Sequence, residues 1–531
     1  MLDPQKDSFY GISINHAYDF LKEKTYTPVI VAVLDGGIDT THEDLKNVLW
    51  HNPKEIAGNG IDDDGNGYVD DIYGWNFLGN KNGENVKKEN GENSRVYYRF
   101  RQMFGTKKID EDTLSEENKW LYEEWKKAES QMAIGDDEQT DLMMYEIAEK
   151  TIKKHDEVLR AEMKRDTFMI DDVEAFSPQN QKAKQAKLGY LTFVRMIGVD
   201  GEETNAGILS ELDEYISGKK SALEAKLTEP ENYRKEIVKD DYENFNDKYY
   251  GNGDVMGPDP LHGTHVSGII AAQRNNGIGI DGVADHIKIM MLRILSDGDE
   301  YDKDVALGIR YAVDNGAKII NMSFGKSFSP EKKWVDDAVL YAQSKDVLII
   351  HAAGNESHDL DSVDNFPNDS LIFHHAKATN FISVGASSDE HIGKGDIIPY
   401  FSNYGKKSVD VFAPGVKIYS TLPQTNRYGF EDGTSMAAPV VTGIAALIRS
   451  YYPQLTAQQV KYAIEQSAVH LLDTAQLVKE PGKELKIPFS ALSKTSGFVN
   501  AYTALQLAST LKPDVADTKK QINPIAKNQN K

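Results

Sequence analysis

The amino-acid sequence predicts an α/β protein with a doubly wound, mostly parallel sheet and a large helical insertion. Three observations support this fold class. Short apolar, β-branched runs recur along the chain, helical patterns lie between several of them, and one long charged block interrupts the alternation. A continuous apolar run suits a strand buried on both faces of a parallel sheet, and strand–helix alternation is typical of doubly wound sheets.

Six apolar runs are the expected strands of this sheet. The first, PVIVAVLD at 28–35, is apolar throughout until it ends in an aspartate. The other expected strands are 286–295, 317–324, 346–353, 381–387 and 409–413. Helical patterns at 302–315 and 331–345 separate some of these runs, which favours crossover connections between parallel strands.

The charged block at 81–250 is the expected insertion. It is rich in Lys, Glu, Asp and Tyr, and apolar residues recur at helical spacing over 116–133 and 139–163, which predicts amphipathic helices. Long insertions cost little loop entropy, so a packed decorative subdomain is favoured over a lid or a partner-binding arm. The domain division predicted around this insertion is a first part at 1–80, a second part at 251–511 and a polar, disordered tail at 512–531.

Composition narrows the functional classes. The chain has 531 residues, a formal net charge of −23 and no cysteine. The acidic balance argues against a nucleic-acid partner, and the absence of cysteine excludes disulfides, zinc–thiolate sites and a cysteine nucleophile. No apolar run reaches the length of a membrane span. The first residues carry neither a basic nor an apolar leader segment, so the sequence allows either a cytosolic protein or one whose leader has been removed.

Three short segments carry residues suited to nucleophilic catalysis. Asp35 ends the first expected strand, His262 begins a helix rich in small residues, and Ser435 lies at a turn into another helix. Open α/β sheets place their sites at strand carboxyl ends and helix amino ends. A serine hydroxyl needs a base within hydrogen-bond reach, and that base needs an orienting carboxylate. The order Asp, His, Ser suits such a triad.

Together, the segments VAVLDGGID, HGTHVSG, NMSFG, AAGNE, FAPG and GTSMAAP resemble the subtilisin-like serine proteases. The resemblance implies that Asp35 orients the base, that His262 is the general base and that Ser435 is the nucleophile. It also implies that Asn355 and the Ser435 N–H stabilise the oxyanion, and that His265 is structural. Two positions depart from the common family pattern, Val440 where many relatives have His and Gly36 where they have Ser.

Two calcium sites are expected. The first is the acidic loop at 59–75, where crowded carboxylates repel one another unless a cation neutralises them; the alternative is an acidic turn exposed to water. Its candidate ligands are Asp62, Asp64, Asn66, Asp70 and Asp71. The second rests on the resemblance, which implies that Asp44 and Asn276, in the loop at 273–282, belong to a calcium site.

The resemblance also implies two segments that pair with a bound peptide as an added strand. The residues expected to bind substrate are Gly298, Asp299, Glu300, Ser323, Phe324, Gly325, Ala353, Gly354 and Glu356. Acidic side chains in this set, with Asp364 before the NFP stretch that resembles the base of the S1 pocket, lead us to expect a preference for Lys or Arg in the substrate. The alternative is that these carboxylates point to water.

Two functions from different classes follow from the sequence. The first is a secreted or cell-envelope serine endopeptidase that acts on proteins or peptides. The second is a catalytically silent binding module that engages a partner through its helical insertion; it would require the loss of a catalytic residue, and Asp35, His262 and Ser435 are all present. An esterase of the GxSxG type would need the order Ser, Asp, His, which this chain does not have.

Overall fold

The computed structural model describes residues 9–106, 108–132, 136–197, 204–392, 396–470, 475–480, 483–513 and 523–524. The polar tail predicted over 512–531 lies outside the described residues, except for 512–513 and 523–524. The chain divides into two compact units. Unit 1 contains Met1–Glu92 and Asn232–Lys531, and unit 2 contains Asn93–Glu231.

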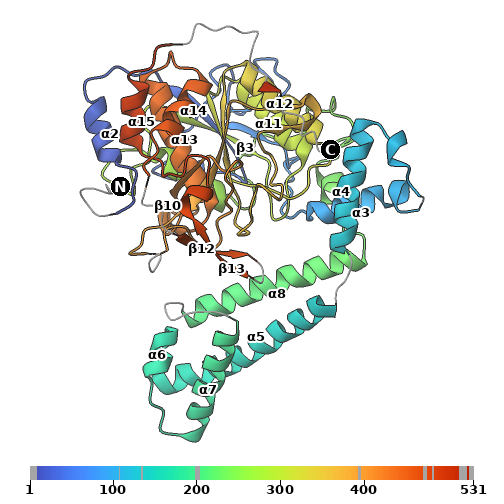
Figure 1. Ribbon diagram of the computed structural model, residues 1–531, viewed down its shortest axis with the longest axis vertical. Helices are drawn as coiled ribbons and strands as arrows, with labels where there is room; N and C mark the ends of the chain where they lie inside the picture. Colours follow the sequence, from blue (N-terminus) through green and yellow to red (C-terminus); the bar gives the residue numbers. More distant parts are fainter. Residues whose placement is uncertain are drawn as a thin grey trace. The chain divides into compact units, whose positions relative to one another are not determined.

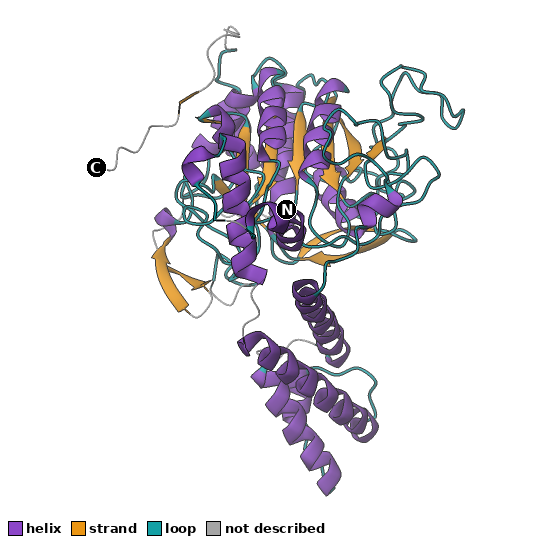
Figure 2. Ribbon diagram, turned by 90° about the vertical axis from the view of Figure 1, so that its right-hand side faces the viewer, coloured by secondary structure: helices purple, strands orange, loops and turns teal. Residues whose placement is uncertain are grey.

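A seven-stranded parallel sheet forms the centre of unit 1. Its strand order is β2-β3-β1-β4-β5-β8-β9, and Figure 2 shows these strands side by side with helices packed on both faces. The six apolar runs in the sequence correspond to six of these strands, and only the short β2 has no such signal. The strands are β1 (Val29–Asp35), β2 (Gly74–Asn76), β3 (Ile287–Arg293), β4 (Ile319–Met322), β5 (Leu348–Ala352), β8 (Phe381–Ser387) and β9 (Val411–Pro414).

Alternate side chains of the sheet enter two separate cores. In β1, Val31 and Val33 belong to one apolar cluster, whereas Ala32 and Leu34 belong to the other. Helices α13, α14 and α15 cover the first face and α11 and α12 cover the second (Figure 1). The helices of unit 1 are α2 (Ile14–Leu21), α9 (Tyr233–Ile237), α10 (Leu261–Ala271), α11 (Asp302–Asp314), α12 (Lys332–Ser344), α13 (Thr434–Tyr451), α14 (Ala457–Gln466) and α15 (Ala501–Ala508).

The strand order determines which loops meet at the carboxyl edge of the sheet. β3 and β4 flank β1 on either side, and β5 follows β4. The carboxyl ends of these four parallel strands therefore bring Asp35 together with the segments that follow β3, β4 and β5. The remaining strands form small sheets: β10 (Ile418–Leu422) with β11 (Arg427–Glu431), β12 (Ala475–Glu480) with β13 (Lys483–Pro488), and β7 (Ala376–Lys377) between β6 (Ser370–Leu371) and β14 (Asn523–Pro524).

Unit 2 consists mainly of helices, as the charged block predicts. Two of them, α4 (Glu116–Met132) and α5 (Asp136–Met163), coincide with the helices expected at 116–133 and 139–163. Ile152, Tyr190 and Ile208 are central to its apolar core. The other helices here are α3 (Glu92–Phe104), whose first residue is the last of unit 1, α6 (Ile170–Ala175), α7 (Gln181–Met196) and α8 (Asn205–Leu227).

A buried charge network fixes the chain where it returns to the sheet after unit 2. Arg234 in α9 is 2% exposed and pairs with Asp240 at 2.8 Å and with Asp304 of α11. Lys303, beside Asp304, pairs with Asp240 at 2.7 Å. Buried charges are tolerated when they are paired and fully hydrogen-bonded, so this network specifies one position for the returning segment.

Candidate active site

The first feature of the site is a hydrogen bond between Asp35 and His262. Asp35 ends β1 and is fully buried, and its Oδ1 lies 2.8 Å from Nδ1 of His262, the second residue of α10. The Gly36 N–H donates to the same oxygen at 2.7 Å. A carboxylate only accepts hydrogen bonds, so Nδ1 carries the proton. In the neutral ring, Nε2 is then left with its lone pair, ready to accept a proton.

Two glycines allow α10 to approach β1 closely. A Cβ atom at Gly263 would lie 2.1 Å from the carbonyl oxygen of Gly37. Gly37 itself has φ +135°, and a Cβ there would lie 2.2 Å from the Met256 carbonyl oxygen. Any larger residue would force these segments apart. Gly263 thus allows α10 to lie against the end of β1, and Gly37 allows the segment just before α10 to do the same, which lets the His262 ring reach Asp35.

Ser435 lies in the first turn of α13 and is linked to the end of β4. Its hydroxyl donates to the Ser323 carbonyl at 2.9 Å, and the Ser323 hydroxyl donates back to the Ser435 carbonyl at 2.9 Å. Within the described residues, no hydrogen bond joins the Ser435 hydroxyl to the His262 ring. Because amide groups in the first turn of a helix have no intrahelical acceptor, the Ser435 N–H remains available as a donor.

Asn355 follows β5 and is fixed against the start of α13. Its Oδ1 accepts hydrogen bonds from the N–H of Thr434 at 2.9 Å and from the Thr434 hydroxyl at 3.0 Å. The Gly354 N–H in turn donates to the Thr434 hydroxyl. Thr434 is the residue directly before Ser435. Because Asn355 Oδ1 faces Thr434, the NH₂ group of this exposed asparagine is left as a second donor beside Ser435.

The site is electrostatically biased toward a protonated imidazole. Burial is the largest influence and lowers the pKa of His262, but the Asp35 carboxylate, with Glu431 and Asp259, more than compensates, so that the pKa is raised. The ring retains 39% of its side-chain exposure. His265, one turn further along α10, is fully buried, and burial lowers its pKa to about 4, so it stays neutral.

Comparison with known proteins assigns the chain to one family. The profile of the subtilase family matches residues 27–491. The chain belongs to the subtilase family. This confirms the resemblance seen in the sequence, and the α/β fold agrees with it.

Individual relatives match shorter regions of this subtilase. A thermophilic serine proteinase from a Bacillus species is 39% identical over 219 residues, which cover 41% of this chain and 49% of that protein. Thermitase from Thermoactinomyces vulgaris is 37% identical over 246 residues, 46% of this chain and 75% of thermitase. The chain thus spans about half the length of the first relative. A solved protease from Pseudoalteromonas arctica superposes with a TM-score of 0.39 at 27% identity, over 49% of this chain and 79% of that one.

Arg293 supports Asp35 from the neighbouring strand, and the sequence analysis missed it. It ends β3 directly beside Asp35 in the sheet register and is 1% exposed. Its guanidinium donates to the Gly36 carbonyl at 3.0 Å and to the Val86 carbonyl at 2.6 Å. Burial lowers its pKa to about 10, which still leaves it charged at neutral pH. The one sequence feature that could have indicated this role is the position of Arg293 at the end of the apolar run IKIMMLR.

The residues expected to bind substrate lie in the segments after β3, β4 and β5, but their carboxylates differ in accessibility. Glu300 is 4% exposed, and burial raises its pKa to about 8. The Asp299 carboxylate accepts the Glu92 N–H at 2.6 Å. Glu356 is exposed and accepts a hydrogen bond from Asn403 at 2.6 Å, and Asp364 is also exposed. The segments themselves are Gly298–Glu300, Ser323–Gly325 and Ala353–Glu356.

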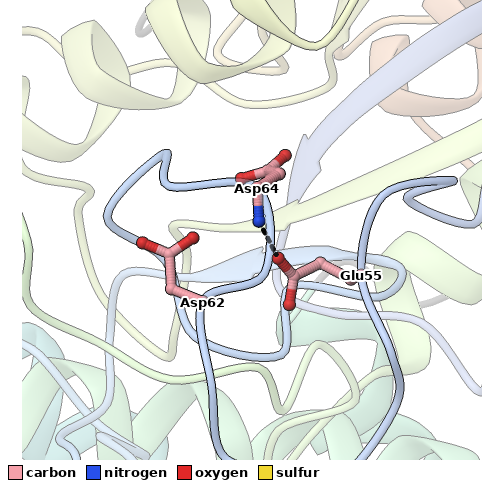
Figure 3. Close-up of side chains that lie close together, drawn as sticks. All are labelled: Glu55, Asp62 and Asp64. Atoms are coloured by element: carbon pink, nitrogen blue, oxygen red, sulfur yellow. Dashed lines mark hydrogen bonds between the residues drawn. The ribbon is translucent and has the colours of Figure 1, made fainter.

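The acidic loop gathers some of the expected metal ligands and adds one. Oxygen atoms of Glu55, Asp62 and Asp64 lie within 4.8 Å of one another (Figure 3). Glu55 comes before the dense acidic run in the sequence, and its negative charge is the one sequence feature that could have suggested it as a ligand. The other expected ligands, Asn66, Asp70 and Asp71, form hydrogen bonds of their own, as Asp62 does with the N–H groups of residues 65, 66 and 67. Asn66 donates to Asp71, Asp70 accepts the N–H groups of residues 58, 59 and 60, and Asp71 also accepts from Asn52 and Tyr311.

The two residues expected at the second metal site lie in contact with each other. Asp44 is fully buried, and its Oδ1 accepts a hydrogen bond from Asn276 at 2.6 Å. Its Oδ2 accepts the Ile280 N–H at 3.0 Å. A Cβ atom at Gly279 would lie 2.4 Å from Oδ2, so the loop closes tightly around this carboxylate.

Among the residues that the structure describes, no helix has the length and apolarity needed to cross a membrane.

The influence of Glu431 on His262 can be measured directly. Replacing Glu431 with Gln removes a carboxylate that favours the imidazolium, so we expect the pKa of His262 to fall by a few tenths of a unit. If catalysis needs the neutral ring, activity will rise as pH increases through this pKa, and the acid limb of the pH profile of Glu431→Gln will move to lower pH.

The measurement is an NMR titration of ¹³C-labelled histidine, with the His262 signal assigned from His262→Ala. Asp314→Asn, in α11, is the matched control, because Asp314 is not among the groups that shift His262. An unchanged His262 titration in Glu431→Gln would contradict this account of the site.

Proposed function

We propose that this subtilase is a serine endopeptidase that cleaves proteins or peptides through an Asp35–His262–Ser435 triad. The observation that carries the proposal is the 2.8 Å hydrogen bond between buried Asp35 and His262 Nδ1. We further propose that the enzyme acts outside the cytoplasm, in secreted, periplasmic or cell-surface form. The acidic loop and the Asp44 loop, if they bind calcium, suit the millimolar calcium concentrations found outside the cytoplasm.

In the proposed reaction, the Ser435 hydroxyl first turns from the Ser323 carbonyl toward His262, a rotation about one side-chain bond. His262 Nε2 takes the hydroxyl proton while Oγ attacks the scissile carbonyl carbon. Asp35 stabilises the imidazolium that forms. His262 then returns the proton to the leaving amine, which departs and leaves an acyl-enzyme. Water, activated by the same ring, releases the acid product.

The negative oxygen of the tetrahedral intermediate is stabilised by two donors. One is the NH₂ group of Asn355, whose orientation is fixed because Oδ1 accepts from Thr434. The other is the N–H of Ser435 in the first turn of α13, where the helix dipole also favours negative charge. Both donors are positioned before the substrate arrives, so little reorganisation is needed during the reaction.

The nucleophile can be tested with a covalent label. A fluorophosphonate probe should modify the wild-type protein at Ser435, because the activated hydroxyl attacks phosphorus as it would a carbonyl. The variants Ser435→Ala and His262→Ala should lose the label, and their peptide hydrolysis should fall by at least about 1000-fold. Ser344→Ala, which removes an exposed hydroxyl at the end of α12, is the matched control and should keep the label. Labelling of Ser435→Ala at full strength would refute the assignment.

We propose that the substrate residue before the scissile bond is basic. Glu356 and Asp364 are exposed near the loop that follows β5. Between the segments after β4 and β5 lies Asn365, whose Nδ2 donates to the Ala353 carbonyl at 2.9 Å. Its amide packs against Gly325, where a Cβ would lie 2.4 Å from Oδ1 and 2.8 Å from Nδ2. Exposed carboxylates and this amide oxygen favour a side chain that carries positive charge and hydrogen-bond donors.

Cleavage-site profiling on a mixed peptide library tests this preference. We expect Lys and Arg to dominate before the cut in the wild type, and Glu356→Gln to reduce their share by several fold, because one attracting carboxylate is lost. Glu390→Gln, also exposed and on a loop after β8, is the control and should leave the profile unchanged. Dominance of apolar residues at this position in the wild type would contradict the proposal.

We propose that calcium binds the acidic loop and the Asp44 loop as a structural ion. In the acidic loop, Glu55 Oε2 is buried and has no hydrogen-bond partner among the described residues, and a carboxylate oxygen of Glu55 lies within 4.8 Å of oxygens of Asp62 and Asp64. Such an oxygen-only donor set fits Ca²⁺, which would neutralise the crowded carboxylates. At the second site, Asp44 and Asn276 would supply side-chain ligands.

Chelation should therefore destabilise the protein. A ligand that binds only the folded state at about 100 times its Kd adds about 2.7 kcal/mol of stability, so adding EDTA should lower the thermal midpoint by several degrees. Asp62→Asn should weaken the response to calcium, and Asp19→Asn, exposed and distant in sequence from both loops, should retain it. Differential scanning calorimetry at defined free calcium measures both effects. An identical midpoint with and without calcium would contradict the proposal.

A further inference from the structure

A buried lysine connects the two segments expected to pair with a peptide backbone, residues 298–300 after β3 and residues 323–325 after β4. Lys326 directly follows Gly325, and its side chain is only 2% exposed. Its Nζ donates to the Glu300 carbonyl oxygen at 2.7 Å and to Glu92 Oε2 at 2.9 Å, and it lies 3.0 Å from Asp302 Oδ1. One ammonium group therefore connects the segment after β4 with the segment after β3.

The chain that leads into the insertion runs along the segment after β3. The Glu89 N–H donates to the Asp297 carbonyl at 2.6 Å, and the Glu92 N–H donates to the Asp299 carboxylate at 2.6 Å. Gly298, with φ +130°, is needed there because a Cβ would lie 2.4 Å from the Glu89 carbonyl oxygen. Glu92 is also the first residue of α3. The position of residues 297–300 is thus tied to the start of the insertion.

We propose that Glu92 and Lys326 are positioning residues that hold the two peptide-binding segments in register, so that the entry to the helical insertion controls the binding of extended substrates. This inference rests on the proposed function. Neither residue exchanges a proton or touches the reacting atoms. Their role is to fix the spacing of residues 298–300 and 323–325, between which an extended peptide would pair with both backbones.

The contacts of the buried Lys326 ammonium leave this arrangement few alternatives. A buried ammonium is costly to desolvate, and it is tolerated only when its hydrogens find acceptors. Here, the acceptors include the Glu300 carbonyl and the carboxylates of Glu92 and Asp302. Weakening the Glu92 contact lets the segment after β3 move relative to the segment after β4. A substrate that contacts only the nucleophile and one side-chain pocket is insensitive to that movement.

The test compares Glu92→Gln with wild type on two substrates that share the same residue before the scissile bond. One is a tetrapeptide anilide, which pairs with both segments, and the other is a single-residue ester. Gln keeps an acceptor for Lys326 but removes the charge. We expect KM for the tetrapeptide to rise roughly 3- to 10-fold, with kcat and ester hydrolysis nearly unchanged.

The matched control is Asp336→Asn, because Asp336 and Lys332 form another buried ion pair, at 2.8 Å, on α12. A loss of folded protein would lower both activities in proportion. The inference is overturned if the ratio of tetrapeptide to ester kcat/KM stays at the wild-type value in Glu92→Gln, or falls equally in Asp336→Asn.

A second measurement separates this inference from the proposed function. If wild type hydrolyses neither substrate, the proposed function fails, but peptide binding can still be followed by fluorescence anisotropy. In the Ser435→Ala background, Glu92→Gln should then raise the Kd of a labelled tetrapeptide by the same factor of roughly 3 to 10. An unchanged Kd overturns the inference independently of catalysis.

Discussion

The hydrogen bond between Asp35 and His262 is the interaction on which the arrangement of this site depends. It requires a fully buried carboxylate at the end of the central strand and a helix that comes close enough for an imidazole to reach it. The backbone of Gly37 and Gly263 allows that approach, and Arg293 holds the Gly36 carbonyl from the adjacent strand. The ring nitrogen that faces away from Asp35 is left free because the other one is occupied.

Much of the fold follows from the sequence because the sheet is buried on both faces. Strands that contact two cores are apolar at most positions, and such runs are visible in the sequence. β2 escaped prediction because a three-residue strand, GWN, carries no periodic pattern. Helices α4 and α5 of unit 2 were visible for the opposite reason: apolar residues recur in them at spacings of three and four, which marks one apolar face.

The catalytic candidates could be named from short motifs, but the residues that support them could not. Arg293, Lys326 and Glu55 are charged, and charged residues are ordinarily exposed, so the sequence favours solvent for each. The same reasoning treated Glu300 as accessible, whereas it is 4% exposed. Burial of a charged group depends on hydrogen-bond partners that arrive from distant parts of the chain: acceptors for a cation and donors for a carboxylate. The partners of Lys326, for example, come from residues 92, 300 and 302.

Three buried cations have a common physical role, because each bonds to chain at one end of the insertion. Arg293 reaches the carbonyl of Val86, Lys326 reaches Glu92, and Arg234 reaches Asp240 and Asp304. All three therefore lie where the chain leaves the sheet for the insertion or returns from it. An insertion of any length costs little in loop closure, but its ends must be held if the neighbouring loops carry a catalytic site. A buried cation does this well, because any displacement leaves a charge without acceptors.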